Sequence, residues 1–115
     1  MSRLIALIAA LALAACSAKA DPIGDAARGK GLMTTYGCGT CHETPGVAGA
    51  HGMVGPPLTH MARRTIIAGL LPNTAPNMVH WLRAPQSVVP GNAMPNMAMS
   101  EQDGRDLAAF LATLR

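Results

Sequence analysis

Five consecutive residues, Cys38-Gly39-Thr40-Cys41-His42, have the types and spacing best suited to chemistry in this chain. Positions i, i+3 and i+4 of a helical turn share one face, so the two thiols and the imidazole point the same way. This spacing is typical of the attachment site of a c-type haem. Cys38 and Cys41 would form thioethers with the two vinyl groups, and His42 would bind the iron as the proximal ligand. The pattern therefore predicts one covalently bound haem c.

Other chemistry for these cysteines fits the sequence less well. A redox dithiol of the thioredoxin kind expects a βαβ pattern around it, and the sequence has no such pattern. A zinc site needs two further ligands at suitable spacing, and there is no second cysteine pair. A structural disulfide is the third alternative. The chain has three cysteines, and if two bind haem and the third belongs to an export signal, none is left for a disulfide.

Residues 1–20 predict an export signal ahead of a single domain over 21–115. A short basic start precedes an apolar run over 4–15, which suits a signal peptide and is too short to span a bilayer. Two cleavage positions are open. Cleavage before Cys16, where a lipobox cysteine belongs, would give a lipid-anchored protein on the periplasmic side of a membrane, and we favour this interpretation. Cleavage after Ala20 would give a soluble periplasmic protein instead.

The composition indicates a small domain and argues against nucleic acid as a partner. The net charge of +3 would fall to +1 on cleavage after Ala20, because seven basic and six acidic side chains would remain. The sequence has no basic patch with interleaved aromatic residues. It has one Trp, one Tyr and one Phe, so a covalently held porphyrin would supply apolar mass that so small a core lacks.

The predicted fold class is all-α, with three to five short helices wrapped around the haem. The first helix begins within 21–25 and ends at Gly37. Its internal Gly29 and Gly31 each cost about 1 kcal/mol, which predicts close contact with another helix. Ser100 is expected to cap the last helix. Its apolar stripe has helical spacing and should meet those glycines: Leu107, Phe110, Leu111 and Leu114.

The middle of the chain alternates between loops and shorter helices. Glycine and proline predict a loop over 44–57, and a second helix is expected over 58–68. Thr74 is expected to cap a third helix that Pro85 ends. A proline-bearing loop follows over 86–99. Neither a strand pattern nor an internal repeat is present.

The order of these elements resembles class I cytochromes c: helix, C-x-x-C-H, G-P-x-L, helix, methionine loop and terminal helix. The segment 37–115 is similar to the cytochrome c domain at the C-terminus of subunit II in caa3-type cytochrome oxidases. Two features depart from that pattern. The sequence has no cupredoxin domain with a binuclear copper site, and Pro57 stands where an acidic residue is usual. The similarity rests on five stretches: 37–42, 55–60, 71–74, 81–86 and 90–96.

The resemblance implies roles for individual residues around the haem. Met94 would be the distal iron ligand, with Met97 as its rival, and thioether-plus-imidazole ligation raises the reduction potential. The carbonyl of Pro56 would accept the second ring N–H of His42, which fixes the tautomer and strengthens the imidazole as a ligand. Leu58 would pack against the ring. Together these residues suit electron transfer.

Several other residues have two interpretations. Trp81 would either donate its indole N–H to a haem propionate, with Arg63 or Arg64 nearby, or pack in the core. The methionine spacing over 94–99 also resembles a copper(I) site, although core packing is the better interpretation. The remaining histidines are expected at the surface: His51, His60 and His80.

These features predict a monohaem c-type cytochrome that carries one electron at a time and is not an enzyme. Its partners would be redox proteins, namely a quinol- or dehydrogenase-side donor and an oxidase-side acceptor, with no small-molecule substrate. The alternative is a haem-bearing subunit of a larger oxidoreductase such as a cytochrome oxidase. A peroxidatic or ligand-binding haem protein would need an open sixth position on the iron, and Met94 argues against it.

Overall fold

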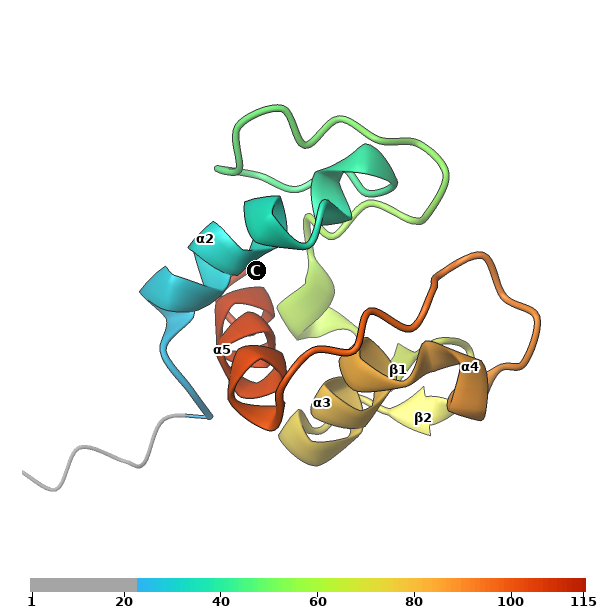
Figure 1. The fold of residues 1–115 in the computed structure, drawn as a ribbon. Helices are drawn as coiled ribbons and strands as arrows, with labels where there is room; N and C mark the ends of the chain where they lie inside the picture. Colours follow the sequence, from blue (N-terminus) through green and yellow to red (C-terminus); the bar gives the residue numbers. More distant parts are fainter. Residues whose placement is uncertain (1–22) are drawn as a thin grey trace, which may run out of the picture.

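The computed structural model describes residues 23–115 (Figure 1), so the predicted export signal, its domain boundary and Cys16 lie outside the described residues. The described part is mainly helical, as predicted. None of its helices is long and apolar enough to cross a membrane. Its α-helices are α2 (Ala26–Thr35), α3 (Ala75–Arg83), α4 (Pro85–Val88) and α5 (Glu101–Leu111). The shorter elements are the 3-10 turns η1 (Cys38–Thr40) and η2 (Met61–Arg63) and the strands β1 (Ile66–Ile67) and β2 (Leu71–Pro72).

Side-chain caps determine where three of the helices begin. The side chains of Asp25, Thr74 and Ser100 each accept a hydrogen bond from the backbone N–H three residues later. This satisfies an N–H that has no partner inside the helix. The predicted caps at Thr74 and Ser100 are therefore confirmed, and α2 begins after Asp25. α5 packs against both α2 and α3 (Figure 1). The cap at Ser100 therefore fixes where the central helix of the fold begins.

The contact between α2 and α5 depends on one of the two glycines. Gly29 is buried, and a Cβ there would overlap the backbone carbonyl of Asp106 and lie 3.0 Å from the Cβ of Phe110. Gly31 is exposed, and a Cβ there would meet nothing within 4 Å. The expectation of a close helix contact is confirmed for Gly29 and wrong for Gly31, because Gly31 lies on the outer side of α2.

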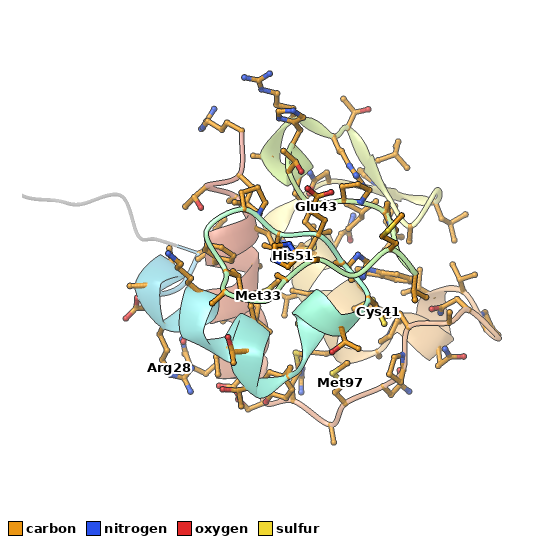
Figure 2. All side chains as sticks on the ribbon, turned by 90° about the horizontal axis from the view of Figure 1, so that it is seen from above. Arg28, Met33, Cys41, Glu43, His51 and Met97 are labelled. Carbon is orange, nitrogen blue, oxygen red and sulfur yellow. The ribbon has the colours of Figure 1, made fainter. Side chains whose placement is uncertain are left out.

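A buried carboxylate ties the start of α2 to α5. Asp106 is 1% exposed and accepts hydrogen bonds from the backbone N–H of Asp25 at 2.8 Å, from Arg28 at 2.5 Å and from Gln102 at 2.8 Å. Burial by itself raises the pKa of the Asp106 carboxyl, but these donors outweigh it and hold the pKa below its ordinary value. Arg28, labelled on α2 in Figure 2, also pairs with Asp103 at 2.7 Å.

The helix expected over 58–68 is mostly wrong. This segment contains only the 3-10 turn η2 and then β1, which pairs antiparallel with β2 so that Ile67 lies opposite Leu71. Ala68 and Gly69 have φ angles of 54° and 68°, and two left-handed residues in a row cannot continue a helix. The β-branched side chains of β1 favour the extended backbone that leads into this turn.

Pro85 ends α3 as predicted, and it also begins α4 within the segment expected to be a loop. Ala84 separates the two helices with φ −145° and ψ 59°. Proline costs little as the first residue of a helix, because the N–H that it lacks has no helical partner there. Pro85 is among the fully buried side chains, so α4 is fixed at its first residue.

Candidate haem-binding site

A largely apolar cavity of about 340 Å³ lies between the helices and the two long loops. Its wall includes Met33 of α2 and Met97 of the last loop, which Figure 2 labels together with Cys41 on a third segment. Segments that are far apart in the chain therefore meet here. The structure brings together at this cavity every predicted site residue that it describes: Cys38, Cys41, His42, Pro56, Leu58, Trp81 and Met94.

The C-x-x-C-H segment forms a single tight turn at the cavity. Gly37 follows Tyr36, the cap residue at the end of α2, and has a left-handed backbone with φ 67°; η1 begins at the next residue. The backbone N–H groups of Cys41 and His42 both donate to the carbonyl of Cys38, at 3.2 and 3.0 Å. Burial raises the pKa of the Cys38 thiol. This turn supplies two thiols and an imidazole to the same cavity.

The 44–57 segment is a loop, as predicted, and its second half returns beside this turn. The N–H of Gly52 donates to the Gly39 carbonyl at 3.0 Å, and the N–H of Gly55 donates to the Cys41 carbonyl at 2.7 Å. Glu43 and His51 pair as an isolated antiparallel bridge and lie side by side in Figure 2. These contacts position the backbone around Gly55 against the cavity-lining turn.

The imidazole of His42 has a defined tautomer and a close backbone neighbour. Its Nδ1 lies 2.8 Å from the carbonyl oxygen of Pro56. A carbonyl oxygen only accepts, so Nδ1 carries a proton, and in the neutral ring the lone pair that can bind a metal ion is on Nε2. A Cβ on Gly55 would overlap the ring, since it would lie 2.7 Å from Nδ1 and 2.9 Å from Nε2. This donor set fits an axial ligand of haem iron.

Gly55 is a residue of the site whose role the sequence analysis missed. In the sequence it is part of the G-P-x-L stretch, in which only Pro56 and Leu58 received roles, and a glycine before a proline by itself indicates a turn. The requirement for glycine comes from the His42 ring, thirteen positions earlier in the chain. Only the return of the loop shows that the two residues are in contact.

Methionines supply much of the remaining wall. Both Met94 and Met97 line the cavity, so the two rivals for the distal ligand lie at the same site. Met99 is 5% exposed and belongs to the hydrophobic core. Met33, at 1% exposed, extends the wall from α2. Thioether side chains provide a polarisable, adaptable surface for a large flat ligand.

Trp81 and Arg64 provide N–H donors in the wall. Both side chains are half-buried, and Arg64 donates to the Pro57 carbonyl at 2.6 Å. Arg63 is exposed and does not line the cavity. The other described histidines are exposed, as expected: His51, His60 and His80.

A small helical fold in which the C-x-x-C-H turn, its imidazole and two methionines face one apolar cavity has the donor set of a haem-binding protein. The match to the family model for cytochrome c covers residues 26–115, and the chain therefore belongs to the cytochrome c family. Cytochrome c oxidase subunit 2 of Alkalihalophilus pseudofirmus is 37% identical over 89 residues, which cover 76% of this chain and 25% of that relative. The chain thus spans about a quarter of the length of that relative. The predicted all-α class I fold and the resemblance to oxidase subunit II are confirmed at this level.

Proposed function

We propose that this protein is a monohaem c-type cytochrome that carries one electron at a time on the outer side of the cytoplasmic membrane. The observation that carries the proposal is the geometry of His42, whose Nδ1 donates to the Pro56 carbonyl and whose ring lines the cavity together with Cys38 and Cys41. When bound, haem c supplies an iron that alternates between the ferrous and ferric states.

The residues of the chain bind and orient the haem and shield it from water. Cys38 and Cys41 would hold it through two thioethers, and His42 would bind the iron through Nε2. Met94 is the better distal ligand of the two methionines, because two amide side chains hold its backbone. Gln86 of α4 donates to its carbonyl, and Asn92 of the loop accepts from its N–H. Met97 remains the rival.

The remaining residues of the wall have two roles, apolar packing against the macrocycle and polar contacts to its propionates. Leu58 is buried and would pack against the macrocycle. We propose that Trp81 and Arg64 face the propionates, because both offer N–H groups at the cavity. Apart from Cys38, Cys41, His42 and Arg64, the described wall has no titratable side chain. A peroxidatic reaction needs a positioned acid or base, so we expect an electron carrier without enzymatic turnover.

Visible spectra of the haem-loaded protein, with and without carbon monoxide, test the ligation. We expect a low-spin reduced spectrum, a weak long-wavelength methionine–iron band in the oxidised form, and no reaction with carbon monoxide. Met94→Ala should lose the band and bind carbon monoxide, whereas the matched variant Met97→Ala should keep wild-type behaviour. The reverse result would assign Met97 as the ligand, and a high-spin wild type that binds carbon monoxide would refute His/Met ligation.

The alternative function is a haem-bearing subunit of a larger oxidoreductase, and the similarity to an oxidase subunit 2 supports it. We favour the carrier, with a quinol- or dehydrogenase-side donor and an oxidase-side acceptor. Solubilisation in mild detergent followed by size-exclusion chromatography separates the two. A carrier should elute as a monomer, whereas a subunit should elute with the rest of its enzyme.

We also propose that the protein is exported and anchored through a lipid on Cys16. The support is the position of Cys16 directly after the apolar run over 4–15. The native protein should then fractionate with membranes, and Cys16→Ala should release it or block its maturation. Recovery of a soluble periplasmic protein that begins at Asp21 would refute the anchor and support cleavage after Ala20.

A further inference from the structure

The segment that presents Met94 is tied to α4 by the side chain of Gln86, the second residue of that helix. Nε2 of Gln86 donates to the carbonyl oxygens of Asn92 and Met94, both at 2.8 Å. Its Oε1 accepts from the backbone N–H of Gly91 at 2.9 Å. One amide therefore binds three backbone groups of the methionine segment.

Asn92 makes a second set of bonds to the same segment. Its Oδ1 accepts from the backbone N–H of Met94 at 2.7 Å. Its Nδ2 donates to the carbonyls of Val89 at 2.7 Å and Pro85 at 3.2 Å. Together with Gln86, it leaves both polar groups of the Met94 backbone bonded to amide side chains.

The chemistry of the partners fixes the orientation of the Gln86 amide. Two of its three partners are carbonyl oxygens, which accept only, and the third is an N–H, which donates only. A carboxylate of the same shape has no donor for the two carbonyls. Gln86→Glu would therefore keep the volume of the side chain and place a negatively charged oxygen against the carbonyls of Asn92 and Met94.

The helix α4, which carries Gln86, is itself held in place by burial and helix packing. Pro85 at its start is fully buried, and α4 packs against α3, which packs against α5. Asn92 and Met94 themselves line the cavity. A change in the Gln86 bonds therefore acts on the cavity wall more directly than on the helical core.

We propose that Gln86 and Asn92 are positioning residues that hold Met94 at the sixth position of the haem iron. This inference rests on the proposed ligation by Met94. Each bond to the Met94 backbone opposes movement of the segment away from the cavity, so losing them raises the population in which the thioether is displaced. Because thioether ligation raises the reduction potential, the same loss lowers the potential.

The test compares haem-loaded wild type, Gln86→Glu and Asn77→Ala. Asn77 is a matched control, because its side-chain amide donates to the Pro72 carbonyl at 2.9 Å and does not line the cavity. For Gln86→Glu we expect about a tenfold larger displaced population, seen as faster carbon monoxide binding, because two donor bonds are lost. The methionine–iron band should weaken and the reduction potential should fall. Asn77→Ala should leave all three readouts unchanged.

If Gln86→Glu yields no haem-loaded protein, Gln86→Ala provides the same test without the added charge, and we expect the same changes with smaller amplitude. A wild-type band, potential and carbon monoxide response in the Gln86 variant would overturn the inference and leave ligation by Met94 intact. A wild type that lacks the band and binds carbon monoxide would overturn both. Equal changes in Asn77→Ala would also overturn the inference, because a non-specific destabilisation of the fold would then explain the changes in both variants.

Discussion

The contact between α2 and α5 predicts opposite effects of the same substitution at two glycines in one helix. Replacing glycine by alanine inside a helix stabilises it by about 1 kcal/mol, because the unfolded chain loses conformational freedom. At Gly31 nothing lies within 4 Å of the new Cβ. Gly31→Ala should therefore raise the free energy of unfolding by about 1 kcal/mol.

At Gly29 the same gain is opposed by a collision with backbone. The new Cβ would overlap the carbonyl of Asp106, whose side chain is buried and hydrogen-bonded and cannot move away independently. Overpacking of a tight contact costs about 1–3 kcal/mol. Because the obstacle at Gly29 is backbone, we expect the overpacking cost of Gly29→Ala to be about 3 kcal/mol. After the helix gain, the net loss is about 2 kcal/mol, so the two variants should differ by about 3 kcal/mol.

Thermal unfolding of the haem-loaded proteins, followed by far-ultraviolet circular dichroism, measures this difference. In a domain of this size 1 kcal/mol corresponds to about 4–8 °C, so Gly29→Ala should unfold at least about 12 °C below Gly31→Ala. A Gly29→Ala protein as stable as wild type would refute the close approach of α2 and α5. A destabilised Gly31→Ala protein would refute the argument from helix propensity, because that position has no neighbour to disturb.

Two further predictions concern the site and the buried carboxylate. Gly55→Ala adds a Cβ that would overlap the ring of His42, so we expect it to reduce haem incorporation, seen as a lower ratio of haem to protein absorbance. Equal incorporation would show that the ring can move aside. For Asp106, a lowered pKa means that its contribution to stability is present above the ordinary carboxyl pKa of 3.8 and is lost as the pH falls through the folded-state pKa. The urea midpoint of the wild type should therefore decrease as the pH falls below about 5. Asp106→Asn should lower the midpoint at pH 7 and make it depend less on pH. An Asp106→Asn protein with the wild-type pH profile would contradict the role given to this carboxylate.

The features that the sequence determined by itself depend on short stretches of chain. The turn over 38–42 follows from five adjacent residues, and the caps at Thr74 and Ser100 involve an N–H only three residues away. Such local patterns can be identified without knowing where the rest of the chain lies. The expected helix over 58–68 shows the limit of such reasoning, because this segment forms a 3-10 turn and a strand that leads into the left-handed turn at Ala68 and Gly69.

The tertiary structure decided the features that depend on distant backbone. Gly29 and Gly31 are equivalent in the sequence, and only the position of α5 makes one of them necessary. Gly55 is needed because a loop returns to the His42 ring. The bonds of Gln86 reach residues only five to eight positions away, but they too depend on how the loop after α4 turns back toward it. Close approach and hydrogen bonding depend on fractions of an ångström between segments, and no periodicity or composition encodes those distances.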